Sequence, residues 1–243
     1  MKIGILGDIH ANLEAFHAIL GALQAEECGK ILCTGDVVGY GPNPQECVDL
    51  VRELELPCVM GNHDEWTVVQ QVRWEISDLV REDISWTRGI LTEDAMAWLT
   101  ELPRFCAYGG VEVVHASNAP SMSWPYVRDE KSLVMNFKYQ KCSICFNGHT
   151  HVPAVACKSP DTDPLFLELP EQMQLPSGCK LLINPGSVGQ PRDRDPRAAC
   201  AIYETRDRSL RFVRVPYDLA RTQAAMAAVE RPQHFIDRLA LGQ

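Results

Sequence analysis

Residues 2–20 read KIGILGDIHANLEAFHAIL, and this segment joins a strand pattern to a helix pattern. Its first six residues form a short apolar, β-rich run, and from Asn12 to Gln24 apolar side chains recur every three or four residues, the period of an amphipathic helix. The alternation returns at Lys30–Thr34, which precedes a predicted helix over Pro44–Leu54, and a third apolar run follows at Cys58–Met60. Strands that alternate with helices form βαβ units, so this part of the chain predicts a parallel sheet in an α/β fold.

The rest of the chain divides into a helical segment, a strand-rich segment and a helical tail. Helical periodicity runs throughout residues 65–102 and returns in a tail at about 217–243, with a break at Pro232. Between them, short apolar runs separated by Gly and Pro predict a second, largely antiparallel or mixed sheet, with strands near 105–108, 111–115, 143–147, 152–157, 165–169, 180–184, 199–204 and 210–215. Two stretches without periodicity are predicted to be surface loops, at 118–126 and 159–178.

Composition and charge exclude several classes of protein. The 243 residues are 46% hydrophobic, which is enough apolar material for a single domain over residues 1–243. The net charge of −9 disfavours attraction to a nucleic-acid polymer or to an anionic membrane surface. We find neither a signal-peptide pattern nor an apolar run long enough to span a bilayer, and we expect a cytoplasmic protein whose scattered cysteines are reduced.

Histidines gather where predicted strands end. Of the seven histidines, five occupy such positions: His10, His63, His115, His149 and His151. Asp8, Asp36, Asn62 and Asp64 lie close to them in sequence. Ligands of open α/β sheets bind at the carboxyl ends of strands, so these side chains are predicted to share one rim. Residues two apart in extended backbone point the same way, and we expect the pairs 8 with 10 and 149 with 151 each to present two ligands together.

This mixture of nitrogen and oxygen donors suits divalent transition-metal ions. Manganese is the favoured ion, and Fe, Zn, Ni and Co also accept such donors. The donors exceed what one ion takes, so two ions that share a carboxylate fit the count. Two such ions favour phosphoryl chemistry, because they lower the pKa of a bridging water and neutralise charge on the non-bridging oxygens.

Five blocks, in this order along the chain, resemble the calcineurin-like metallophosphoesterases. The blocks are DIH at 8–10, GDVVGYG at 35–41, GNHD at 61–64, a single histidine at 115 and GHTH at 148–151. NPGSVGQPRD at 184–193 resembles the closing segment of the bacterial and archaeal stand-alone subgroup, so the resemblance covers residues 1 to about 195. It implies an α/β fold of the metallophosphoesterase type, a four-layer α/β/β/α sandwich with two mixed sheets.

The resemblance also implies a role for each residue of the blocks. One ion is expected on Asp8, His10, Asp36 and His151, and the other on Asp36, Asn62, His115 and His149, with Asp36 as the bridge. His63 is expected to protonate the leaving group or bind its oxygen, Asp64 to orient that imidazole, and His10 to help stabilise the charged phosphoryl oxygens. The implied activity is hydrolysis of a small phosphodiester or nucleotide by direct attack of a metal-bridging hydroxide.

The second block departs from that of the serine/threonine protein phosphatases. Those enzymes carry GDxVDRG, in which an Asp helps the catalytic histidine and an Arg binds phosphate, whereas this chain has Gly39 and Tyr40 at those places. They also carry an Arg directly before the third block, where this chain has Met60. A phosphomonoesterase or protein phosphatase is therefore the weaker alternative, and a non-catalytic metal-binding scaffold is a further one.

Candidate substrate contacts are Tyr40, Asn43 and Arg192, and the aromatic residues Trp124 and Tyr126 could stack on a nucleobase. The same features resemble bacterial proteins described as diadenosine tetraphosphatase-like. The expected partner is thus a small phosphorylated molecule, with a nucleotide among the candidates. A homo-oligomer stays open, because the tryptophan-containing helical segment could bury against a second subunit.

Overall fold

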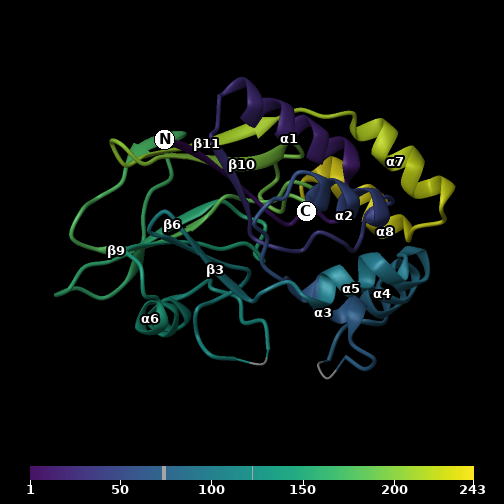
Figure 1. The fold of residues 1–243 in the computed structure, drawn as a ribbon, viewed down its shortest axis with the longest axis horizontal. Coiled ribbons are helices and arrows are strands. Elements are labelled where there is room, and N and C mark those ends of the chain that lie inside the picture. Colours follow the sequence, from purple (N-terminus) through teal and green to yellow (C-terminus); the bar gives the residue numbers. More distant parts are fainter. Residues whose placement is uncertain (73–74, 122) are drawn as a thin grey trace.

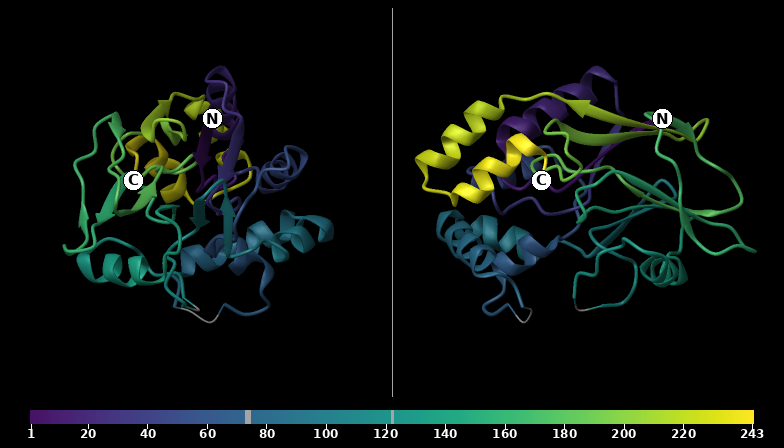
Figure 2. Two further views of the ribbon diagram at one scale, coloured as in Figure 1. Left: turned by 60° about the vertical axis from the view of Figure 1, so that its left-hand side comes forward. Right: turned by 180° about the vertical axis from the view of Figure 1, so that it is seen from behind.

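The computed structural model describes residues 1–243 except 73–74 and 122. Two sheets lie face to face, with α1 (Leu13–Ala25) on the outer side of one and α6 (Glu130–Tyr139) on the outer side of the other (Figure 1). The remaining helices gather at one end of the molecule, and two further views show the same layering (Figure 2). The predicted four-layer α/β/β/α sandwich with two mixed sheets is confirmed.

The first sheet has the order β2-β1-β10-β11-β8. β1 (Lys2–Leu6) pairs in parallel with β2 (Lys30–Cys33), as the βαβ pattern predicts. The antiparallel strands β10 (Ala198–Glu204), β11 (Ser209–Val215) and β8 (Gln172–Gln174) complete it, so the sheet is mixed.

Two expectations about this sheet are wrong. The apolar run at 58–60 forms only an isolated bridge between Cys58 and Cys33. The two strands that the sequence predicts near 199–204 and 210–215, as part of the second sheet, lie in the first sheet. Strand periodicity identifies a strand and its buried face but not its partner, so sheet membership could not be read from these runs.

The second sheet is mixed, as predicted, with the order β3-β4-β5-β9-β6-β7. Its strands are β3 (Phe105–Tyr108), β4 (Val111–Val114), β5 (Ile144–Phe146), β9 (Lys180–Asn184), β6 (Ala154–Lys158) and β7 (Leu165–Phe166). β4, β5 and β9 run parallel, so the chain leaves β4 and β5 at the same edge of the sheet.

The predicted helical segment at 65–102 is three helices: α3 (Asn62–Val68), α4 (Asp78–Ile90) and α5 (Glu93–Thr100). Residues 69–72 and 75–77 between α3 and α4 are not helical, and Arg73 and Trp74 lie outside the described residues. The other helices are α2 (Pro44–Glu53), α7 (Leu219–Ala228) and α8 (Gln233–Leu241), and Pro232 precedes α8 as the predicted break requires.

Two elements escaped the sequence analysis. α6 follows the loop predicted at 118–126, and its start is marked by a capping box in which the Asp129 side chain accepts from the Ser132 backbone N–H. β8 lies inside the loop predicted at 159–178, on the edge of the first sheet, where it is largely exposed. A short exposed edge strand gives almost no hydrophobic pattern.

Separate hydrophobic clusters hold the layers together. Ile3 and Ile5 of the first sheet pack with Phe146 and Ile183 of the second between the two sheets. Another cluster joins the first sheet to α1, α2 and α5, and a third joins α6 to the second sheet. A fourth packs Tyr40 against α8, so the C-terminal helices touch the loop after β2.

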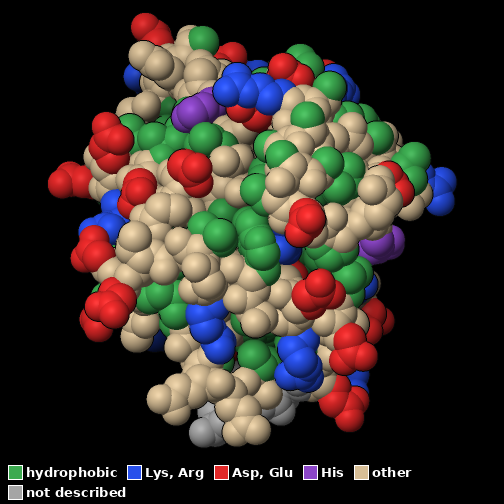
Figure 3. Space-filling view, turned by 90° about the vertical axis from the view of Figure 1, so that its right-hand side faces the viewer, with side chains coloured by type: hydrophobic (Ala, Val, Ile, Leu, Met, Phe, Trp, Pro, Cys, Tyr) green, Lys and Arg blue, Asp and Glu red, His purple; other side chains and the backbone are tan. Residues whose placement is uncertain are grey.

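The described helices include none that is both long and apolar enough to cross a membrane. The end of the molecule that carries α3–α5, α7 and α8 shows Lys and Arg side chains as separate groups among acidic and apolar ones (Figure 3).

Candidate active site

The residues of the five blocks converge on one edge of the sandwich. Asp8 and His10 follow β1, Asp36 follows β2, and these parallel strands deliver them side by side. The second sheet contributes in the same way, since His115 follows β4 and the pair His149 and His151 follows β5. Asn62 and His63 open α3. All these side chains are buried.

The backbone at these positions is not extended. The φ angles are 49° at Asp8 and His10, 52° at Asp36, 69° at His149 and 60° at His151. The expectation that extended backbone presents ligands two residues apart is therefore wrong, and left-handed turns present them instead. Such conformations cost about 1–3 kcal/mol each for residues other than Gly, and they gather at functional sites because the surrounding fold holds them.

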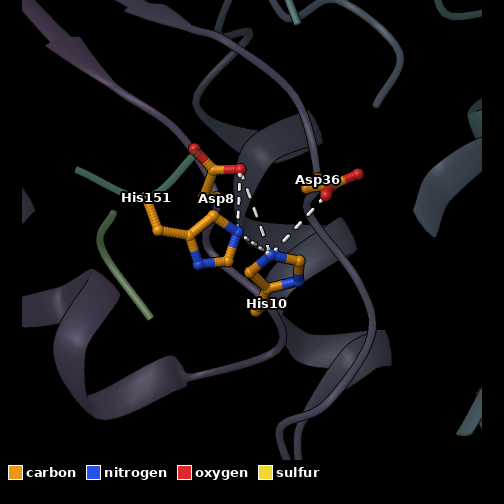
Figure 4. Close-up of side chains that lie close together, drawn as sticks. All are labelled: Asp8, His10, Asp36 and His151. Atoms are coloured by element: carbon orange, nitrogen blue, oxygen red, sulfur yellow. Dashed lines mark hydrogen bonds and ion pairs between the residues drawn. The ribbon is translucent and has the colours of Figure 1, made fainter. Parts of the chain in front are cut away.

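A first cluster consists of Asp8, His10, Asp36 and His151 (Figure 4). Nε2 of His151 lies 3.3 Å from Oδ1 of Asp8, and Nε2 of His10 lies 3.5 Å from Oδ2 of Asp36. The two Nε2 atoms of His10 and His151 are only 3.0 Å apart. Four potential ligand atoms thus surround one point.

A second cluster consists of Asp36, His115 and His149. Nε2 of His115 lies 3.4 Å from Oδ2 of Asp36 and 2.9 Å from Oδ1 of Asn62. The other oxygen of Asp36, Oδ1, accepts a hydrogen bond of 2.8 Å from the backbone N–H of His63. Oδ2 of Asp36 therefore faces both clusters and is the only oxygen of this carboxylate left to be shared.

Backbone carbonyls fix which nitrogen of each imidazole faces inward. Three of the imidazoles use Nδ1 for this contact. The Nδ1 atom of His10 lies 3.0 Å from the Val38 carbonyl oxygen, that of His115 lies 2.8 Å from the Thr34 oxygen, and that of His151 lies 2.6 Å from the Gln190 oxygen. His149 uses Nε2, which lies 3.0 Å from the Trp124 carbonyl oxygen. A carbonyl oxygen only accepts, so each of these nitrogens carries a hydrogen, and in the neutral rings of His10, His149 and His151 the other nitrogen presents a lone pair. Nε2 of His115 faces oxygens of Asn62 and Asp36 and carries a second hydrogen, which must leave before this nitrogen can bind a metal ion. The same arrangement orients metal-ligating histidines in proteins.

This donor set fits divalent cations. The Nε2 lone pairs of His10 and His151 face each other at 3.0 Å with no hydrogen to share, a repulsive contact that a cation between them would turn into an attraction. Ligand atoms about 2.1 Å from one ion lie roughly 3 Å apart, and neighbouring ligand atoms of the first cluster lie 3.0 to 4.0 Å apart. We conclude that the buried Asp/His cluster is suited to a metal site.

Electrostatics within the cluster agree with this reading. Burial raises the pKa of Asp8 to about 7, although His115 opposes the shift. Burial would lower the pKa of His115, but the Asp36 carboxylate outweighs it and raises the pKa to about 9. Burial would likewise raise the pKa of Asp36, yet the neighbouring imidazoles of His115 and His63 hold it well below its usual range. Buried carboxylates of this kind gain from a bound cation.

His63 stands next to the two clusters but is not part of either. Its ring centroid lies 5.0 Å from that of His10 and 4.4 Å from that of Tyr40. Burial lowers the pKa of His63 to about 4, so the ring is neutral at neutral pH unless an anion approaches. An imidazole placed beside the ligands in this way is available to the leaving group of a substrate.

Asp64 does not orient His63 in the way the resemblance implies. Its Oδ1 accepts from the backbone N–H groups of Val37 at 2.9 Å and Val38 at 3.2 Å, and its Oδ2 accepts from that of Gly61 at 2.9 Å. Asp64 therefore ties the loop that carries Asp36 to the start of α3. Among the described residues, the carboxylate that approaches a ring nitrogen of His63 is that of Asp83, which could not be predicted from the sequence motifs.

The candidate substrate contacts differ in where they lie. Tyr40 is buried between His10 and His63, and the Arg192 guanidinium lies 5.9 Å from the Tyr40 ring centroid. Asn43 precedes α2, and its side chain donates to Glu46 at 3.3 Å on the surface of that helix. The structure thus brings Tyr40 and Arg192 to the site but leaves Asn43 outside it.

A cavity of about 340 Å³ opens beside His63 and His149. Aromatic side chains line it, namely Tyr40, Trp66, Trp124 and Tyr126. Tyr126 stacks on His149 with ring centroids 4.0 Å apart, and the Arg128 guanidinium covers Tyr126 at 4.0 Å from its centroid. The loop predicted at 118–126 therefore forms a wall of the cavity, as a functional surface loop would.

Comparison with known proteins agrees with the fold and the cluster. Residues 1–208 match the family model of the calcineurin-like phosphoesterase superfamily domain. The chain belongs to this superfamily, and the resemblance of the five blocks is confirmed. Its members are hydrolases that act on phosphate esters, which implies a small phosphorylated substrate.

Particular relatives span the whole chain. A crystal structure of a metallophosphoesterase from Sphaerobacter thermophilus has a TM-score of 0.86 and 38% identity, covering 100% of this chain and 99% of that one. An uncharacterized protein of Methanocaldococcus jannaschii is 34% identical over 246 residues, 99% of this chain and 98% of its own length. A hypothetical protein of Pyrococcus horikoshii has a TM-score of 0.79 at 18% identity, covering 100% of this chain and 98% of that one, and shares the fold.

Proposed function

We propose that the protein is a phosphoesterase that uses two divalent metal ions to hydrolyse a small phosphodiester or nucleotide. The observation that carries the proposal is Oδ2 of Asp36, which lies 3.5 Å from the inward nitrogen of His10 and 3.4 Å from that of His115. One oxygen between two sets of donors supports a shared ligand. The family membership supports the reaction type.

Each ion would take a different set of side chains. Asp8, His10, Asp36 and His151 would hold one, and Asp36, Asn62, His115 and His149 the other. Carboxylate, amide and imidazole donors together favour Mn²⁺, with Fe, Zn, Ni and Co as alternatives. Bound there, the ions would polarise phosphoryl oxygens and activate water for attack near neutral pH.

His63 would act on the leaving oxygen. Its ring is neutral at neutral pH, and the negative charge of a bound phosphate ester would favour its protonated form. Both nitrogens of His10 are committed, one to the Val38 carbonyl and one to the cluster. His10 has no N–H left for a phosphoryl oxygen, so we assign it as a ligand rather than as the second catalytic group expected from the resemblance.

The lining of the cavity favours a diester over a monoester. Among the described lining residues there is no Lys or Arg, and Glu75 adds a negative charge. The Arg192 guanidinium lies 5.9 Å from the ring centroid of Tyr40, at the side of the cavity. A phosphodiester carries one negative charge and a monoester close to two, so this cavity repels the diester less. Its volume and aromatic walls suit the organic part of a nucleotide.

The test is hydrolysis of bis(p-nitrophenyl) phosphate beside p-nitrophenyl phosphate, with chelated protein resupplied with Mn²⁺. We expect metal-dependent cleavage that prefers the diester, and loss of cleavage in Asp36→Asn. Asp49→Asn is the matched control, because Asp49 is an exposed carboxylate on α2. Preference for the monoester would instead support the phosphatase alternative. Bound metal without turnover of any phosphate ester would support the non-catalytic scaffold.

A further inference from the structure

His63 faces a carboxylate that comes from a distant part of the chain. Oδ2 of Asp83, on α4, lies 3.8 Å from Nδ1 of His63. Asp83 is 0% exposed. Nδ1 of His63 is itself buried, and among the described residues it has no hydrogen-bond partner. An approach of about 1 Å would make a hydrogen bond between the two groups, and catalytic contacts often tighten in this way when substrate binds.

Gly39 explains why the carboxylate comes from α4 instead of the second block. A Cβ atom at position 39 would lie 2.5 Å from Nδ1 of His63, and the φ angle there is +93°. Position 39 is the place of the Asp that helps the histidine in GDxVDRG. Here the His63 ring fills the space which that side chain would need, and Asp83 approaches the same nitrogen.

Asp83 is held in place from two directions. Both of its oxygens accept from the Tyr40 backbone N–H at 3.0 Å, and its Oδ1 pairs with the Arg231 guanidinium. Arg231 is only 5% exposed, stacks on Trp86 at 3.9 Å and donates through Nε to the Tyr40 carbonyl at 3.3 Å. Oδ2 is thus the oxygen left facing His63.

A buried ion pair is weak evidence for a stabilising role, because removing two charges from water offsets most of their attraction. Asp83 and Arg231 are nevertheless fixed in a single geometry that also fixes Tyr40, a wall of the cavity. The Asp83–Arg231 pair therefore fixes the position of Tyr40 beside the substrate cavity. Arg231 lies beyond residues 1–208, so it comes from outside the segment that the family model matches.

We propose that Asp83 is the positioning residue for His63, and that Arg231 from the C-terminal segment holds Asp83 for this task. The inference rests on the proposed function of His63. Asp83 accepts the hydrogen of Nδ1 and stabilises the imidazolium form. Nε2 then gives its proton to the leaving oxygen as the P–O bond breaks, and the neutral ring keeps the hydrogen on Nδ1.

The test combines a spectrum with kinetics on Asp83→Asn. The Arg231 guanidinium donates to Oδ1, so the oxygen of the new amide takes that place, and the NH₂ group faces His63 and donates to Nδ1. We therefore expect ¹⁵N NMR to show hydrogen on Nδ1 of His63 in the wild type and on Nε2 in Asp83→Asn. The His63 signals are assigned by their absence in His63→Gln.

The kinetic arm compares diesters with good and poor leaving groups in the Mn²⁺-loaded protein. General acid assistance contributes about 10²–10⁴-fold, so we expect Asp83→Asn to lose at least about tenfold in kcat for alkyl leaving groups and little for p-nitrophenol. The double variant with His63→Ala should be no slower than His63→Ala alone. Glu82→Gln, an exposed neighbour on α4, is the control that should change neither readout.

Each outcome decides the inference. An unchanged tautomer in Asp83→Asn, or losses that multiply in the double variant, would overturn it. If the wild type hydrolyses no phosphate ester, the proposed function fails while the spectrum still decides whether Asp83 sets the His63 ring. Asp83→Asn leaves Arg231 buried without its partner, so Asp83→Asn with Arg231→Gln provides a variant free of the unpaired charge if the single variant does not fold.

Discussion

Replacing Asp36 with Asn should weaken metal binding at both sites at once. Oδ1 of Asp36 accepts from the His63 backbone N–H at 2.8 Å. In the Asn variant the amide oxygen must take that place, because an NH₂ group would meet the N–H donor. The NH₂ group then stands where Oδ2 faced His10 at 3.5 Å and His115 at 3.4 Å. It has no lone pair for a cation, so each ion loses a ligand.

The expected magnitude follows from that geometry. Loss of a group that only supports a ligand costs about 10–100-fold in metal affinity, so losing the ligand itself should cost at least about 100-fold at each site. A factor of 100 corresponds to about 2.8 kcal/mol per ion. Asp8→Asn should affect only the first site, because Asp8 belongs to one cluster. Isothermal titration calorimetry with Mn²⁺ and elemental analysis measure affinity and content. Two ions per chain in Asp36→Asn, or loss of a single ion, would refute the shared-ligand reasoning.

Three further results are expected. His63→Ala should keep its metal content but lose at least about 100-fold in the turnover of substrates with poor leaving groups. His17→Ala is the control and should change neither quantity, because His17 is exposed. Elemental analysis and steady-state kinetics measure both, and loss of metal in His63→Ala would show that His63 also supports the metal site. Gly39→Ala should displace the His63 ring and lower kcat with the metal content unchanged, because the alanine Cβ would lie 2.5 Å from Nδ1 of His63 and φ at position 39 is +93°. Gly21→Ala is the control, because a Cβ at position 21 meets open space. A wild-type kcat in Gly39→Ala would show that this crowding does not occur. Metal affinity should fall as the pH is lowered from 9, and it should fall more steeply below pH 7. The reason is that protons on His115 (pKa about 9) and Asp8 (pKa about 7) must leave when an ion binds. Equal calorimetric affinities at pH 8 and pH 6 would exclude this linkage.

The sequence predicts where most candidate ligands lie, because all of them except Asn62 follow a strand that has its own local pattern. β1 and β2 show short apolar runs, and each ends at a glycine before Asp8 or Asp36. Parallel pairing then brings those ends together without further information. The shared edge of the sandwich could therefore be predicted from local periodicity and from one rule about sheets.

Other features depend on contacts between distant segments. The left-handed φ angles at Asp8 and His10 do not alter the hydrophobic periodicity of the sequence, so the expectation of extended backbone at these residues was wrong. Asp83 sits in the middle of α4, where a buried carboxylate has the same local pattern as a solvated one. The one clue was the absence of an Asp at position 39, since it left the His63 nitrogen without its usual partner.

Sheet membership of the C-terminal strands was unpredictable for the same reason. β10 is buried over residues 198–203 and pairs with both β1 and β11. Its apolar run is consistent with a central strand in either sheet. Only packing against α1 and the first strand decides between them.

Two metal ions that share Asp36 as a ligand are proposed to make the protein a phosphoesterase. The most direct test titrates chelated protein with Mn²⁺ and follows hydrolysis of bis(p-nitrophenyl) phosphate together with the number of ions bound. We expect the rate to be negligible without metal and to reach its plateau at two ions per chain. Full activity without metal, a plateau at one ion, or no hydrolysis with two ions bound would contradict it.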